Sequence, residues 1–190
     1  MNRRLVVLFL VLMVSGVIAG GVFMLLRRPK DPTADIERAR VLMTQGETDR
    51  SKYSEAIMLL NRSGAQNDPE VWLMLGECYM KQPQPDFARA LDCYRNATER
   101  APDDAEILRK YVDMLIGARR LSEALTRAQR LQTLMPDSAE PYRLLARIEF
   151  QGAEGEPGPV ERRRRIEAAL AWVEQAIAKS PSEMESYDIK

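Results

Sequence analysis

Histidine is absent from the 190-residue sequence, and cysteine occurs only twice, as Cys78 and Cys93. Without histidine, the Ser-His and Cys-His pairs of hydrolases and every His-ligated metal site are excluded. Two cysteines are also too few for a four-cysteine zinc site. The sequence has no glycine-rich phosphate loop after a strand and no recognisable group of carboxylates. We therefore expect no catalytic residue, no metal site and no cofactor, and we do not expect an enzyme.

The chain has no excess of one charge, because 28 basic residues balance 28 acidic ones. The balance is uneven along the sequence: residues 1–30 hold five basic residues and no acid, so residues 31–190 hold 23 basic and 28 acidic residues, a net charge of −5. Binding to nucleic acid requires clustered cations. The sequence therefore predicts no nucleic-acid partner for the part after residue 30. Its composition, 45% apolar and 29% charged, is typical of a folded protein.

Charge is also absent from one long run near the amino terminus, Leu5–Leu26, with the sequence LVVLFLVLMVSGVIAGGVFMLL. As a helix these residues would extend about 33 Å, against a bilayer core of about 30 Å. We predict a basic tail over residues 1–4, a transmembrane helix over 5–26 that acts as a signal anchor in the lipid bilayer, and a linker over 27–33. The alternative is a cleavable signal peptide. The apolar run continues past the candidate cleavage site at Ala19 and ends at Arg27 and Arg28, which favours the anchor.

Two signals oppose each other in predicting the side of the membrane on which the rest of the chain lies. Basic residues that follow the span favour a cytoplasmic domain. A short basic amino terminus and a signal-like apolar core favour export, and long domains cross the membrane largely regardless of their charge. We expect a single-pass membrane protein with its folded part on the extracytoplasmic, periplasmic side, with the cytoplasmic side as the alternative.

The sequence after the linker repeats itself. The stretch ERAPDDAEIL, Glu99–Leu108, recurs as TLMPDSAEPY, Thr133–Tyr142, so that Pro102 and Pro136 lie 34 residues apart. Between these prolines apolar residues recur at spacings of three and four, which indicates helices, and Gly117 marks a break between two of them. A period of this length predicts a stack of helix pairs.

The most complete copy of the repeat identifies a family. Its pattern resembles the tetratricopeptide repeat, a helix–turn–helix unit of 34 residues, through Trp72, Leu75, Gly76 and Tyr79 and then Ala90, Tyr94, Ala97 and Pro102. The resemblance implies an all-α fold, a short right-handed helical solenoid of three to four units over residues 34–182. We expect the units at 34–68, 69–104, 105–138 and 139–182. Residues 183–190 would start a capping helix or a further helix of a longer array.

Small residues in the repeat predict close packing within each unit. We expect Gly76 on the first helix of its unit to face Ala90 on the second, so that the two antiparallel helices approach closely. Cys78 and Cys93 fall at the edge of the packing stripe, and we expect them to be small packing residues. A disulfide between them is the alternative, if the compartment is oxidising.

In tetratricopeptide repeats the first helices line a concave groove that receives peptides or helices of other proteins. The resemblance implies a partner-binding groove made by Leu73, Glu77, Met80, Arg109, Asp113, Ile116, Arg143, Arg147 and Phe150. We expect the arginines to hold acidic side chains and Phe150 to act as an aromatic anchor. The alternative is that the arginines form a solvated face with internal salt bridges.

We therefore expect a membrane-anchored scaffold or assembly factor that binds other proteins in this groove. A structural solenoid that associates with copies of itself is the alternative, as is a fragment of a longer array of repeats.

Overall fold

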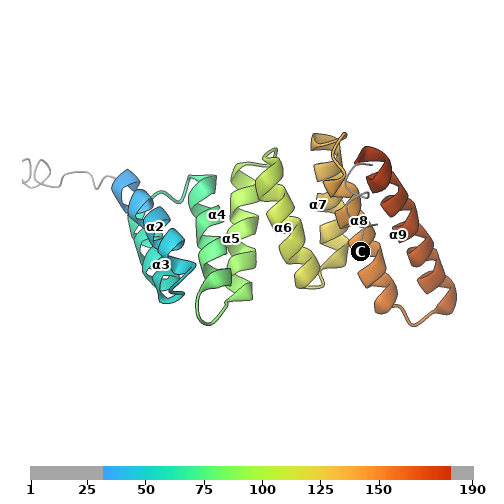
Figure 1. The fold of residues 1–190 in the computed structure, drawn as a ribbon, viewed down its shortest axis with the longest axis horizontal. Helices are drawn as coiled ribbons and strands as arrows, with labels where there is room; N and C mark the ends of the chain where they lie inside the picture. The colour runs from blue at the N-terminus through green and yellow to red at the C-terminus, as the bar shows by residue number, and fades with distance from the viewer. Residues whose placement is uncertain (1–31, 181–190) are drawn as a thin grey trace, which may run out of the picture.

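The computed structural model describes residues 32–180, which hold eight helices and no strand (Figure 1). The predicted membrane helix and residues 181–190 lie outside the described residues. Within residues 32–180 no helix combines the length and apolarity that a bilayer span requires. The helices are α2 (Pro32–Gly46), α3 (Ser51–Ser63), α4 (Pro69–Lys81), α5 (Phe87–Arg100), α6 (Ala105–Gly117), α7 (Leu121–Leu134), α8 (Glu140–Glu154) and α9 (Pro159–Lys179).

The helices form a single row in which each packs against the next one along the chain (Figure 1). We call α2, α4, α6 and α8 the first helices, and α3, α5, α7 and α9 the second helices. First helices also touch each other across the pairs, α2 against α4 and α6 against α8. The prediction of an all-α helical solenoid is confirmed.

Short polar segments set the helix ends. The side chains of Asp68, Asp86 and Asp104 accept hydrogen bonds from backbone N–H groups in the first turns of α4, α5 and α6. These N–H groups have no partner within their own helix, so the carboxylates stabilise the helix starts. Helix α3 ends at Ser63, and the next residue, Gly64, has a φ of 78°, in the left-handed region that favours glycine.

The core is continuous from pair to pair. One cluster of buried side chains joins α2, α3 and α4, and a second runs from α5 to α8, with Tyr79 of α4 packed against both. Tyr142 of α8 and Trp172 of α9 extend the packing, with ring centroids 6.1 Å apart. No pair of helices buries its apolar face alone, and stacking therefore supplies most of the stability.

Glycines of the first helices make room for aromatic rings. A Cβ at Gly76 would lie 3.0 Å from Cζ of Tyr94 on α5, and a Cβ at Gly46 would lie 2.6 Å from Cζ of Tyr53 on α3. All three atoms nearest to such a Cβ at Gly76 belong to Tyr94, so the ring of Tyr94 is the nearest neighbour of this glycine. A large ring fills the space above the glycine, because a flat side chain can lie on bare backbone where a branched neighbour could not.

Candidate binding groove

Two hollows lie along the first helices and define what we call the groove. The first hollow has a volume of about 380 Å³ and is bounded by α2, α4 and α6. Its apolar lining consists of Met43, Leu73 and Met74, and its polar lining consists of Arg40, Thr44, Glu70, Glu77, Glu106 and Lys110. It is an open hollow in which three apolar side chains lie among six polar or charged ones.

The second hollow follows along α4 and has a volume of about 300 Å³. It is lined by Glu77, Met80, Lys81, Tyr94, Lys110, Asp113 and Met114. Both hollows share Glu77 and Lys110, so this pair stands between them. The sequence predicted three groove residues in this helix, and all three line this one surface of α4: Leu73, Glu77 and Met80.

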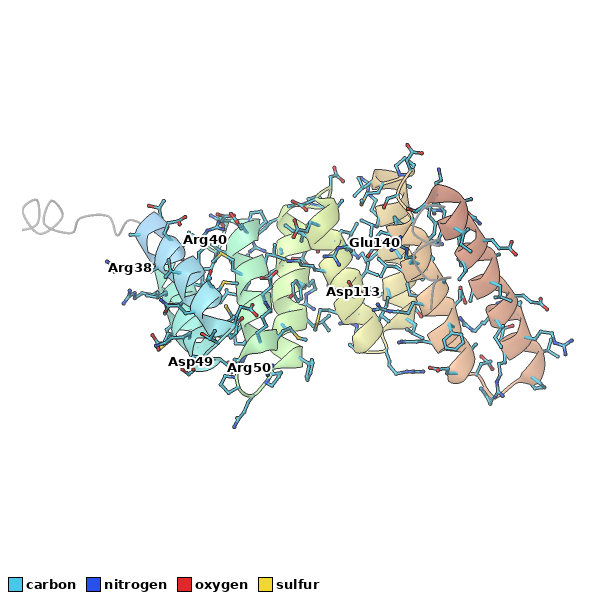
Figure 2. All side chains as sticks on the ribbon, in the orientation of Figure 1. Arg38, Arg40, Asp49, Arg50, Asp113 and Glu140 are labelled. Atoms are coloured by element: carbon cyan, nitrogen blue, oxygen red, sulfur yellow. The ribbon has the colours of Figure 1, made fainter. Side chains whose placement is uncertain are left out.

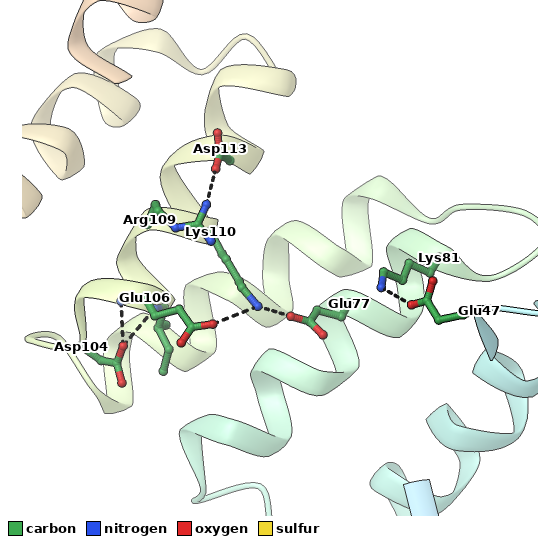
Figure 3. A network of polar contacts seen from close by, with 9 residues as sticks. Glu47, Glu77, Lys81, Asp104, Glu106, Arg109, Lys110 and Asp113 are labelled. Carbon is green, nitrogen blue, oxygen red and sulfur yellow. Dashed lines mark hydrogen bonds and ion pairs between the residues drawn. The ribbon is translucent and has the colours of Figure 1, made fainter. Parts of the chain in front are cut away.

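Lys110 on α6 links two acidic side chains across the groove (Figure 3). Its ammonium group donates a hydrogen bond to Glu77 on α4 and lies 3.4 Å from Oε1 of Glu106 on its own helix. Both Glu77 and Lys110 have only about a quarter of their side-chain surface exposed. The pair joins α4 to α6 and neutralises the boundary between the two hollows.

The predicted groove arginines have carboxylate partners within the chain. Arg109 and Arg147 both pair with Asp113, at N–O distances of 3.2 and 2.9 Å, and Arg143 lies 3.7 Å from Glu140. Figure 2 labels two of these carboxylates, Asp113 of α6 and Glu140 of α8. A ligand carboxylate would therefore have to displace an internal one, and this arrangement favours the solvated, salt-bridged face that the sequence left as the alternative.

Two predicted groove residues lie elsewhere. Ile116 is only 1% exposed and belongs to the core, so it is not available to a partner. It falls on the buried side of α6 because α6 is covered by α5, α7 and α8. Phe150 is 55% exposed but lines a separate hollow of about 420 Å³ between α8 and α9, together with Ala153, Glu154, Arg162 and Ile166.

Several residues that line the two hollows were not predicted from the sequence: Arg40, Met43, Thr44, Glu70, Met74, Lys81, Tyr94, Glu106, Lys110 and Met114. For one of them, Lys110, the sequence does indicate a charged partner. Ile107, Lys110 and Met114 follow each other at the spacing of a buried helix stripe, and a lysine on such a stripe indicates a charged partner on the adjacent helix.

Both cysteines are buried and free, and burial raises the pKa of Cys78 and Cys93 to about 12. The thiols are therefore neutral packing groups, as predicted, and they do not form the disulfide. Within residues 32–180 no group of three His, Cys, Asp or Glu side chains is placed to hold a metal ion, so we assign no metal site to this part of the chain.

Comparison with known proteins agrees with this architecture. The family model of the tetratricopeptide repeat matches residues 84–148, from the turn after α4 into α8. A crystal structure of MamA protein superposes with a TM-score of 0.63 at 13% identity, covering 85% of this chain and 79% of that one. MamA from Desulfovibrio magneticus RS-1 has a TM-score of 0.59 at 17% identity, covering 77% and 76%. At this identity the likeness shows a common fold. A search of curated proteins finds no matching sequence.

Proposed function

We propose that this protein is a membrane-anchored interaction scaffold whose groove along α2, α4 and α6 receives an amphipathic segment of a partner protein. The observation that carries the proposal is the pair of adjacent hollows, each of which holds apolar side chains of α4 beside the charged pair Glu77–Lys110. Leu73 in the first hollow and Met80 in the second are seven residues apart on α4, about 10 Å along the helix axis. A partner helix with apolar side chains at i and i+7 matches this spacing.

The chemistry of the groove favours apolar anchors over an acidic ligand. Arg40 and Lys110, which line it, are already paired with carboxylates, and so are the neighbouring Arg109, Arg143 and Arg147. Methionine side chains, here Met43, Met74, Met80 and Met114, contribute much of the apolar lining. Methionine is flexible and polarisable, so it can adapt to apolar side chains of different shapes. The paired charges on the rim would then orient the partner and select against segments with misplaced charges.

The anchor is the second part of the proposal. A span at residues 5–26 would hold the groove within a short linker of the bilayer, because α2 begins at Pro32. Tethering of this kind raises the effective concentration of the groove toward other membrane proteins without any new contact. We place the folded part on the periplasmic side, and a reporter fused after Lys190 would test that placement.

Near-isosteric substitutions test the groove. Leu73→Asn and Met80→Gln keep the side-chain shape and replace apolar atoms by polar ones, whereas Leu73→Met and Met80→Leu keep the apolar character. The full chain would be purified from its native membranes, and co-purifying proteins would be quantified by mass spectrometry. We expect the same partner to be recovered with wild type and both apolar variants, and about tenfold less with each polar variant, equivalent to about 1.4 kcal/mol.

Gln129→Asn on α7 serves as a control, because Gln129 is exposed on a second helix away from both hollows. Equal recovery by wild type, Leu73→Asn and Met80→Gln would refute the groove as the binding site.

A further inference from the structure

The last helix pair of the described part is longer than the others. Helices α5 and α7 have 14 residues each, whereas α9 has 21, and α7 and α9 both end two residues before a repeat proline, Pro136 or Pro181. The additional turns of α9 therefore lie at its start, over residues 159–165. Helix α8 likewise has 15 residues, against 13 in α4 and α6. An insertion confined to one unit often belongs to a binding face, because the repeat itself does not require it.

These additional turns build the hollow between α8 and α9, which we call the α8–α9 hollow. Ala153 and Glu154 of the last turn of α8 and Arg162 of the α9 extension line it together with Phe150 and Ile166. Phe150 is 55% exposed and Ile166 is 39% exposed, so both present apolar surface to solvent. The volume of about 420 Å³ falls within the range of ligand pockets. The hollow thus has room for a large apolar side chain of another molecule.

The α9 extension carries four consecutive arginines, Arg162–Arg165, within the first two turns of the helix. The start of a helix is the positive end of its dipole, where cations lower helix stability. The residue before the helix, Gly158, offers no side chain to cap it, and Glu161 is the one acid of the first turn. A placement that breaks a local rule in this way points to a role outside the helix.

Two of the four arginines hold the extension in place. Arg164 pairs with Glu161 of the same helix, at an N–O distance of 2.6 Å. Arg165 pairs with Glu149 of α8, at 3.0 Å, and so joins the extension to the preceding helix. The charges of these two arginines are therefore balanced within the chain.

The other two arginines keep an unbalanced charge. The guanidinium of Arg162 donates hydrogen bonds of 3.0 and 2.7 Å to the backbone carbonyl of Glu156, which orients the group without cancelling its charge. Arg163 is exposed and forms no hydrogen bond or ion pair within residues 32–180. Glu154, the acid that lines the hollow, lies 3.8 Å from Arg119. Two cations without a carboxylate partner therefore stand beside an exposed apolar hollow.

We propose that the α8–α9 hollow is a second binding site, which takes an acidic segment of a partner protein. A large apolar side chain of the segment enters between Phe150 and Ile166, and a neighbouring carboxylate pairs with Arg162 or Arg163. The planar guanidinium matches the two oxygens of a carboxylate. A bound carboxylate would also offset the repulsion between these cations and the dipole of α9. The site shares no lining residue with the two hollows of the groove, so it is independent of the groove as a binding site.

The place of the hollow favours a protein segment over an anionic bilayer surface. The predicted span precedes α2, at one end of the row of helices, whereas α8 and α9 lie at the other end (Figure 1). Acidic residues also alternate with the basic ones around the hollow, namely Glu154, Glu156 and Glu161. A flat layer of anionic headgroups would meet these acids together with the arginines, while a single inserted segment can place its carboxylate beside the arginines alone.

Synthetic peptides test the proposal with the full chain in detergent micelles. The first peptide has a phenylalanine flanked on both sides by glutamates, the second has lysines in place of the glutamates, and the third has serine in place of the phenylalanine. Each carries a fluorescein label, and binding would be measured by fluorescence anisotropy. We expect the first peptide to bind about tenfold more tightly than either of the others. Its advantage over the lysine peptide should shrink between about 50 and 300 mM salt.

Exposed positions supply the variants of the protein. Arg163→Gln and Phe150→Ser should each weaken binding of the first peptide about fivefold or more, because they remove the cation and the apolar wall in turn. Arg50→Gln is the control, since Arg50 is also an exposed arginine at the start of a second helix, α3, near the other end of the row (Figure 2). It should leave binding unchanged.

Equal binding of the three peptides, or no binding of the first one up to about 1 mM, would overturn the proposal. A loss with Arg50→Gln as large as that with Arg163→Gln would also overturn it, because the attraction would then be general. Nanodiscs test the bilayer as occupant: Phe150→Cys would be labelled with a water-soluble maleimide, and the buried native thiols add little background. Slower labelling in discs that contain phosphatidylserine than in phosphatidylcholine discs would place the hollow on the membrane and contradict a peptide site.

Discussion

The carboxylate of Asp113 on α6 lies 2.9 Å from the guanidinium of Arg147 on α8 and also pairs with Arg109 on its own helix. One acid thus holds two of the three arginines that the sequence assigned to ligand binding. Arg147 thus joins α8 to α6, Arg109 braces the same acid from within α6, and the neighbouring hollows are the better candidates for partner contact.

Removing one arginine should consequently matter little for binding. Arg147→Ala breaks a half-exposed ion pair, and we expect the free energy of unfolding to fall by less than about 1 kcal/mol. Partner recovery should stay at the wild-type level, since Arg147 lines neither hollow of the groove. Urea unfolding and the co-purification assay measure the two effects, and a tenfold loss of partner would show that Arg147 contacts it directly.

Alanine in place of Gly46, which lies against Tyr53, should cost more stability than alanine in place of Gly117. Gly46→Ala would place a Cβ 2.6 Å from a ring that is 2% exposed and has little room to move. We expect a loss of about 1–3 kcal/mol in the free energy of unfolding.

Gly117→Ala is the matched substitution, because Gly117 also ends a first helix but has no heavy atom within 4 Å of its Cβ position. We expect its stability to be unchanged or raised by up to about 1 kcal/mol through helix propensity. Equal losses in the two variants would mean that the ring contact does not govern the cost.

Buried thiol and phenol groups should make the free energy of unfolding fall at alkaline pH. Burial raises the pKa of Cys78 and Cys93 to about 12, and burial with a hydrogen bond to Glu123 raises that of Tyr111 to about 12. An unfolded cysteine loses its proton near pH 8.5, whereas the folded thiols keep theirs. The folded state then binds more protons, so stability falls as the pH rises from about 8.5 toward 12.

The slope should approach about 1.4 kcal/mol per pH unit for each thiol within this window. Cys78→Ala should show a shallower slope, whatever its effect on stability at neutral pH. Urea titrations at several pH values measure both, and a flat profile between pH 9 and 11 would contradict burial of neutral thiols.

The start of α6 depends on one carboxylate. The side chain of Asp104 accepts hydrogen bonds from the backbone N–H groups of Glu106 and Ile107, at 2.9 and 3.0 Å. Asp104→Ala leaves both groups without this partner, and we expect a loss of about 1 kcal/mol in thermal or urea unfolding. Asp104→Asn keeps an acceptor oxygen and should retain most of the stability.

The repeated proline and the apolar spacing of three and four were enough to predict an all-α solenoid, because stacked helix pairs impose that period on every unit. The same reasoning could not show that Gly76 faces Tyr94, since several second-helix residues lie within reach of a glycine. It also placed Ile116 on the surface, although that side of α6 is enclosed by neighbouring helices. Contacts between helices depend on how far each helix is rotated about its own axis and shifted along it relative to its neighbour. The order of residues in the sequence does not specify either quantity.

The position of Lys110 indicated a charged partner on an adjacent helix, but the sequence did not show which residue that partner is. Glu77 and Lys110 belong to different units, and their approach requires α4 and α6 to lie side by side at a particular offset. The sequence predicted a first-helix surface for partner binding, and the structure shows which of its side chains are paired within the chain.

Site-specific photo-crosslinking addresses the central claim most directly. A photoreactive amino acid would replace Leu73, Met80 or Gln129 in turn, in the full chain in its native membranes. Reactive groups at 73 and 80 should capture the same partner protein, and the group at 129 on α7 should not capture it. Absence of that adduct from both groove positions, or its appearance with equal yield at position 129, would contradict the groove as the site of partner binding.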